Sequence, residues 1–201
     1  MKKLLTLASF LISLNCFAQQ NTCGFDSYRN AQLANQESEE EYNRINQLLH
    51  ERVTDSQLFN RQAGSVRTIP VVVHVVHANG PENISDALVM DGIEELNLRF
   101  QNAAPYTDVS GNDVQIQFCL ASINPEGNAT NGITRTASSN TDIAWNNGAP
   151  NDYGLKNIDR WEPHLYLNIW VVRDISSQAG IIGYSSFPST LNTNPEFDGI
   201  V

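Results

Sequence analysis

The apolar stretch at residues 69–77 constrains the fold of this chain more than any other segment. It reads Ile-Pro-Val-Val-Val-His-Val-Val-His, so β-branched side chains fill most of its positions. A strand this uniformly apolar is typical of the interior of a layered fold, where both of its faces are covered. The turn Asn79-Gly80-Pro81 ends it. The chain must therefore place other elements on both sides of residues 69–77.

The segments that follow supply elements for those layers. Ser85 is a good N-cap for a helix that continues to Phe100. The inward stripe of this helix is Val89, Ile93, Leu96 and Phe100. Alternating apolar residues predict strands at 114–120 and 165–172, with a shorter one at 181–187. Residues 124–151, rich in Gly, Asn, Thr and Ser, predict a long loop. We therefore expect an α/β (α+β) layer fold with a mixed sheet.

The N-terminus has the pattern of a secretory signal peptide at residues 1–18. Lys2 and Lys3 precede an apolar run at 4–14, and small residues before the end predict cleavage after Ala18. A lipoprotein signal ending at Cys16 is the weaker alternative, because Asn15 stands where such a signal needs a small residue. The run is too short to span a membrane. We therefore expect a secreted, extracellular protein.

Charge narrows the range of partners. The net charge is −10, which disfavours nucleic acid and anionic membrane surfaces. The oligomeric state cannot be predicted from these features.

Residues 19–67 are polar and predict a pro-segment with one helix at 38–53; a flexible tail is the simpler alternative. Ser38 and Glu41 have the spacing of a capping box. The apolar stripe of the helix is Tyr42, Ile45, Leu48, Leu49 and Val53. An exposed linker at 61–66 follows, and we expect proteolytic processing near 65–68 with Arg67 flanking the cut. Residues 68–201 then form the main domain.

Few residues carry recognisable chemistry. There is no G-x-S-x-G, P-loop, G-x-G-x-x-G or H-E-x-x-H motif. His74 and His77 are three apart in a strand, so they point to opposite faces and cannot chelate one metal together. His50 and His164 each stand alone. We expect all four histidines to be structural or solvated.

Cys23 is the residue that stands out after the signal peptide is removed, when only Cys23 and Cys119 remain. A cysteine thiolate is a strong zinc ligand, so in a pro-segment it could occupy the open position of a catalytic zinc. A disulfide to Cys119 and a free thiol are the alternatives.

Several segments together resemble the pappalysin family of metzincin zinc metallopeptidases, in particular its cytophagalysin-like secreted bacterial members. These segments are 69–76, Leu96-Asn97-Leu98-Arg99-Phe100, 116–121, Gly132-Ile133-Thr134-Arg135, Trp161 with 166–171, 183–188 and Asp198-Gly199-Ile200-Val201, with Cys23-Gly24 in the pro-segment.

The resemblance implies the upper subdomain of a two-part catalytic domain, with a twisted mixed sheet backed by helices. It also implies a zymogen that hydrolyses peptide bonds in protein or peptide substrates through a zinc-activated water. Cys23 would be the inhibitory zinc ligand, and the edge strand with Gly183, Tyr184 and Ser185 would bind substrate. The zinc helix of the family follows the Asp-Gly-Ile-Val segment, so the catalytic zinc ligands would lie beyond Val201. Calcium is a further cofactor that the sequence leaves open.

The end of the sequence bears on both function hypotheses. Ile200 and Val201 look like the start of a strand, so we expect a truncated domain that lacks the C-terminal zinc-binding half, and we expect this chain alone to be inactive. The alternative from another class is a secreted, non-catalytic binding module that has lost that half.

Overall fold

The computed structural model describes residues 22–23, 36–54, 65–146, 149–176, 180–187 and 194–201. The predicted signal peptide, its cleavage site at Ala18 and linker residues 61–64 lie outside these ranges, so those interpretations stay predictions. No helix within the described ranges is both long and apolar enough to cross a bilayer.

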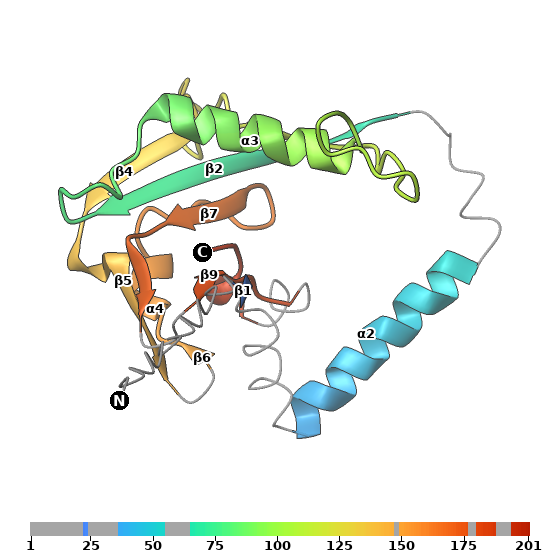
Figure 1. Ribbon diagram of the computed structural model, residues 1–201. Helices are drawn as coiled ribbons and strands as arrows, with labels where there is room; N and C mark the ends of the chain where they lie inside the picture. Colours follow the sequence, from blue (N-terminus) through green and yellow to red (C-terminus); the bar gives the residue numbers. More distant parts are fainter. Residues whose placement is uncertain (1–21, 24–35, 55–64, 147–148, 177–179, 188–193) are drawn as a thin grey trace, which may run out of the picture.

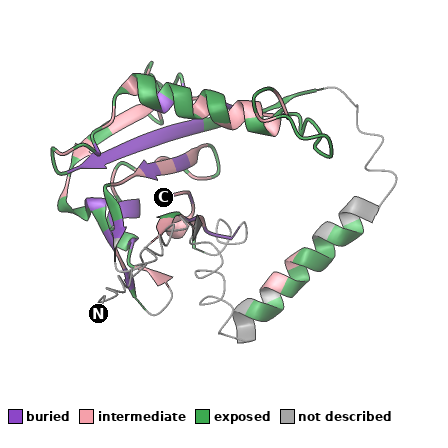
Figure 2. Ribbon diagram, viewed as in Figure 1, coloured by how far each residue is buried: buried purple, intermediate pink, exposed green. Residues whose placement is uncertain are grey.

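Strand β2 (Arg67–His77) is the centre of the fold, as its composition predicted. It pairs in parallel with β3 (Ile116–Leu120) along its first half and with β4 (Ile133–Ala137) along its second half. Strand β7 (Leu167–Val171) pairs in parallel with β2 on its other side (Figure 1). Residues 71–77 are all buried (Figure 2). The predicted strand is thus confirmed, beginning two residues earlier than expected.

Helix α3 (Asp86–Phe100) covers one face of this sheet. The Ser85 hydroxyl accepts a hydrogen bond from the Leu88 amide, which confirms the predicted N-cap. The core on this face contains Val71, Val73, Val75, Val89 and Phe118. The core on the opposite face contains Val76, Ile143, Trp145, Leu155, Trp170, Ile175, Tyr184 and Val201. Burial of β2 on both faces therefore joins two cores through one strand.

The predicted long loop at 124–151 is wrong. Besides β4, this region contains the 3-10 turn η1 (Ser139–Thr141), β5 (Asp142–Asn146) and β6 (Ala149–Pro150). Strand β5 pairs with β6 and with β8 (Asp174–Ser176), and the short helix α4 (Tyr153–Lys156) follows. Their partners are distant in sequence, and this long-range pairing overrides the local turn-like composition.

Helix α2 (Gln36–Thr54) extends along most of its length away from the layered body (Figure 1), which it contacts through Tyr42. The helix predicted at 38–53 is confirmed, beginning two residues earlier and ending one later; the side chains of Ser38 and Glu41 are not among those described, so the capping box stays a prediction. Tyr42 stacks at a tilt against Phe187, with ring centroids 5.3 Å apart, while Leu48 is 43% exposed. The predicted apolar stripe is therefore covered only in part among its described members.

The outer edge of β3 is closed by a side chain of α3. The side-chain Nδ2 of Asn97 donates to the backbone carbonyl of Phe118 over 2.8 Å. The side-chain Oδ1 of Asn97 accepts from the backbone amide of Phe118 over 2.7 Å. One side-chain amide thus occupies the two backbone positions that a neighbouring strand would use. This satisfies polar groups that would otherwise offer a template for pairing with another chain.

His74 lies fully buried on the face of β2 opposite α3 and stacks on Trp170. Its Nε2 is 2.9 Å from Asn168 Oδ1, and its Nδ1 is 2.8 Å from Thr134 Oγ1. The Asn168 Nδ2 group donates to the carbonyls of Trp161 and Tyr166, which turns its Oδ1 toward the ring. Nε2 of His74 therefore donates to Asn168, and in the neutral ring that burial favours, Nδ1 accepts from the Thr134 hydroxyl. The prediction of a structural histidine is confirmed here.

We expect His74 to make stability depend on pH. Burial lowers the pKa of His74 below the usual 6.5, against the opposing effects of Asn168 and Asp159. Below about pH 6.5 the imidazole of His74 is therefore protonated in the unfolded chain but still neutral in the folded chain. Stability should fall as pH drops below 6.5, by at most ~1.4 kcal/mol per pH unit from this group, until the lower folded-state pKa is reached.

His74→Gln keeps a polar group in place but does not titrate. The free energy of unfolding, measured with urea at several pH values between 8 and 5, should depend less on pH in this variant than in the wild type. This holds whatever the absolute stability of the variant. Parallel curves for the two proteins would contradict the assignment of a neutral His74.

Candidate functional site: an open sheet edge

The segment from Ile181 to Ser185 lies beside the chain end. Strand β9 spans Ile181–Gly183, which is shorter than the predicted strand at 181–187. Its continuation at Tyr184 forms two backbone hydrogen bonds with Val201, of 2.9 and 3.0 Å. Ile200 in turn bridges Ile169 of β7 in parallel and Ser185 in antiparallel. The sheet is thereby extended beyond β7 and becomes mixed, as expected.

The two edges of this segment have different roles. The inward edge of Tyr184 is occupied by Val201, so strand alternation turns the backbone groups of Gly183 and Ser185 to the outside. Strand β1 (Thr22–Cys23) lies along that outside edge and pairs with β9 in parallel, Thr22 with Ile181 and Cys23 with Gly183. A segment from the N-terminal region thus occupies the edge that the sequence predicted as a strand-binding site.

Tyr184 differs from its two neighbours because its side chain is buried. Its ring packs edge-on against Trp145 at 5.3 Å, and its hydroxyl donates to Asp152 over 2.9 Å. Of the three residues predicted to bind substrate, Gly183 and Ser185 therefore present backbone to the outside, while Tyr184 anchors the segment to the core.

A buried ion pair lies beneath this edge. The Lys156 ammonium is 3.1 Å from the Asp152 carboxylate, and both side chains are almost completely inaccessible. Burial lowers the pKa of Lys156, while Asp152 opposes that effect. Lys156 also donates to the carbonyl of Phe197 over 2.7 Å and to the Ser186 hydroxyl over 3.3 Å. Nothing in the sequence indicated this pair beyond its i, i+4 spacing, and it lies just after the region predicted as loop.

The turn before the chain end depends on Gly199. Its φ is +116°, and an added Cβ would lie 2.6 Å from a Trp170 ring carbon and 2.8 Å from the Asn168 carbonyl oxygen. The 3-10 turn η2 (Pro195–Phe197) precedes it, and burial raises the pKa of the neighbouring Asp198 carboxyl. The close approach of backbone to β7 is what brings Ile200 and Val201 into pairing distance.

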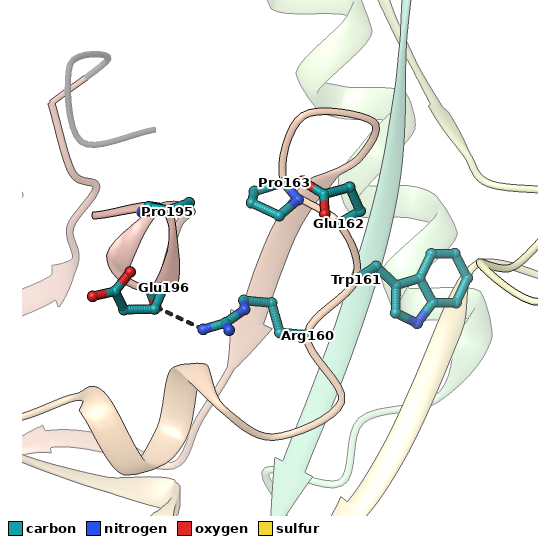
Figure 3. A pocket seen from close by; sticks show the side chains of 6 residues that line it. All are labelled: Arg160, Trp161, Glu162, Pro163, Pro195 and Glu196. Atoms are coloured by element: carbon teal, nitrogen blue, oxygen red, sulfur yellow. Dashed lines mark hydrogen bonds between the residues drawn. The ribbon is translucent and has the colours of Figure 1, made fainter. Parts of the chain in front are cut away.

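A shallow pocket of about 280 Å³ lies between η2 and the loop after α4. Arg160 extends across it and donates to the Glu196 carbonyl over 3.1 Å, whereas Trp161 points away (Figure 3). Its remaining lining residues are Glu162, Pro163 and Pro195. Arg160 and Lys156 thus hold the consecutive carbonyls of Glu196 and Phe197, so this pocket belongs to the scaffold of the edge.

No metal centre is formed by the described residues. None of their His, Cys, Asp and Glu side chains gather in groups of three that could hold an ion. The residues present therefore do not fit a catalytic zinc site, which needs three protein ligands and one open position.

Cys119 is a free cysteine on β3. It forms no disulfide among the described residues, and the role of Cys23, whose side chain lies outside them, stays a prediction. Strands β1 and β3 lie at opposite ends of the extended sheet, separated by β9, residues 199–201, β7 and β2.

The fold is that of metzincin-like metallopeptidases. The particular neighbours are solved structures of mirolysin. They are mirolysin in complex with compound 9 (34% identity, TM-score 0.55, 69% of this chain and 53% of that chain), a Tannerella forsythia promirolysin mutant (33%, 0.54, 81% and 56%), and Tannerella forsythia mature mirolysin in complex with a cleaved peptide (35%, 0.57, 69% and 53%). The chain spans little more than half the length of these proteins. No family model and no curated protein matches it.

Gly199→Ala should destabilise the chain by roughly 2–5 kcal/mol, because a strained φ and a clash with Trp170 act together. Gly92→Ala is the matched control. Gly92 lies exposed in α3 with no atom within 4 Å of an added Cβ, so alanine should stabilise the chain by about 0.5–1 kcal/mol. Urea unfolding measures both effects. Equal effects would mean that the turn at Gly199 does not need glycine.

Proposed function

We propose that the chain is the N-terminal part of a secreted pappalysin-type zinc metalloendopeptidase precursor. The observation that carries this proposal is the outward-facing backbone of Gly183 and Ser185, in a fold shared with mirolysin at 33–35% identity. One of those neighbours was solved with a cleaved peptide. An extended peptide would bind this edge as an additional strand, with backbone hydrogen bonds supplying affinity.

The described residues supply binding and orientation in this proposal. Gly183 and Ser185 present donors and acceptors to the peptide, and Tyr184 holds the edge in place. A zinc ion would supply the activated water. Its ligands would come from residues beyond Val201.

The N-terminal region fits a latency role. We place a pro-segment at residues 19–67, following a signal peptide cleaved after Ala18. The match to promirolysin covers 81% of this chain and the match to mature mirolysin 69%, which supports this division. Arg67 already belongs to β2, and its amide donates to Gln115. We therefore propose processing in the exposed residues Ser65 and Val66, with Arg67 at the new end.

A non-catalytic strand-binding module is the second candidate, because the same edge could bind a peptide without cleaving it. The coding sequence beyond Val201 distinguishes the two. An H-E-x-x-H-x-x-G-x-x-H helix there would favour the peptidase, and a stop would favour the module.

Residues 19–201 should neither cleave casein nor retain zinc at one ion per chain after dialysis, because the described residues offer no three-ligand site. The product of the complete reading frame should do both. Metal analysis and casein digestion measure these outcomes side by side. Stoichiometric zinc with activity in the short form would refute the assignment of the ligands to residues beyond Val201.

Cys23→Ala should give a complete precursor that activates faster and is partly active before cleavage. The reason is that a thiolate on the metal would exclude the attacking water. Cys119→Ser is the matched control, because Cys119 lies at the opposite end of the sheet, and its precursor should stay latent. Peptide hydrolysis before and after activation measures both. A Cys23→Ala precursor as latent as wild type would show that the pro-segment blocks the cleft by bulk alone.

A further inference from the structure

The buried ion pair of Asp152 and Lys156 contacts both strands that build the open edge. Asp152 accepts from the Tyr184 hydroxyl, and Lys156 donates to the Ser186 hydroxyl. Lys156 also donates to the carbonyl of Phe197, the segment that leads through Gly199 to Val201. The pair therefore links two stretches of chain that are distant from it in sequence.

These two stretches are also the ones that pair with each other. Tyr184 and Val201 exchange both of their backbone hydrogen bonds. Ser186 adds a third link, because its hydroxyl donates to the Phe197 carbonyl over 2.5 Å. The outward-facing residues Gly183 and Ser185 stand on either side of Tyr184. The position and register of these two residues along the edge therefore depend on the contacts that Lys156 and Asp152 make with Ser186, Phe197 and Tyr184.

Stability alone is a poor reason for such a pair. Removing two charges from water is costly, and replacing a buried ion pair by apolar groups of similar size is often neutral for stability. Lys156 has no exposed surface, and Asp152 has 4%. The directional contacts of the pair are what an apolar replacement could not reproduce.

We propose that the Asp152–Lys156 pair positions the strand-binding edge, holding residues 184–186 in register with residues 197–201 so that Gly183 and Ser185 can bind an extended peptide. Both members are positioning residues, since their buried side chains would not reach a strand bound at the outside of the edge. The identity of that strand as a peptide substrate rests on the proposed function; the positioning itself does not.

The test compares the 201-residue chain with its double variant D152N/K156M. Asparagine keeps an acceptor for Tyr184, and methionine keeps most of the length of lysine, so no charge is left buried without a partner. Thermal unfolding should give a similar midpoint to wild type. Amide hydrogen exchange at Tyr184 and Val201 should nevertheless become at least tenfold faster, while exchange at Val73 in β2 stays unchanged.

Two further variants sharpen this test. Arg173→Gln breaks an exposed ion pair with Asp142 in the same layer and should leave both edge amides unchanged. Ser186→Ala removes one contact of Lys156 with the edge and serves if the double variant does not fold; it too should raise exchange at Tyr184 and Val201. Unchanged exchange in the folded double variant, or in Ser186→Ala where the double variant does not fold, overturns the proposal.

A kinetic arm separates this inference from the proposed function. In the complete zinc-loaded protein, D152N/K156M should raise KM for a peptide substrate severalfold and leave kcat nearly unchanged, since the pair orients the bound strand. If the edge amides respond but the wild-type protein cleaves no peptide, the proposed function fails and the positioning role stands. If kcat falls while KM is constant, the pair does not act through peptide binding.

Discussion

Everything in this molecule depends on the burial of β2 on both faces. Its odd-numbered valines pack against α3 and its even-numbered residues face the second core, so the strand belongs to two hydrophobic clusters. It also pairs with three other strands along its length. A strand in that position can present few polar groups without partners, and His74 is held accordingly by Thr134 and Asn168. The frame that carries the candidate site is thus packed on both faces and hydrogen-bonded at its centre.

The two ends of the extended sheet differ in whether their outer backbone groups can pair with another strand. At β3 the Asn97 amide satisfies the backbone of Phe118, so that end is closed to a further strand there. At β9 the backbone of Gly183 and Ser185 faces outward, and β1 lies along it. An exposed edge is a liability that proteins usually block. Strand addition is thereby blocked at β3 and takes place at β9, where β1 is the added strand.

Polar contacts support the open edge from below. Lys156 and Arg160 donate to consecutive carbonyls of η2. The Asp152 carboxylate accepts a hydrogen bond from the Tyr184 hydroxyl. Gly199 lets the backbone pass close to Trp170, which brings Val201 beside Tyr184. The edge is therefore built by residues from four separate parts of the chain. None of them would be placed there by local preference alone.

The sequence by itself determined the elements whose character is local. The β-branched run specified β2, and the Ser85 cap with its apolar stripe specified α3, because side-chain shape and periodicity act within each segment. It also indicated 181–187 as an edge strand through its resemblance to known proteins. Only the tertiary structure decided the rest. Strands β4 and β5 exist because distant partners override a loop-like composition, and Lys156 meets Asp152 in a buried site because the core closes around them. Such contacts depend on long-range packing, which no local pattern encodes.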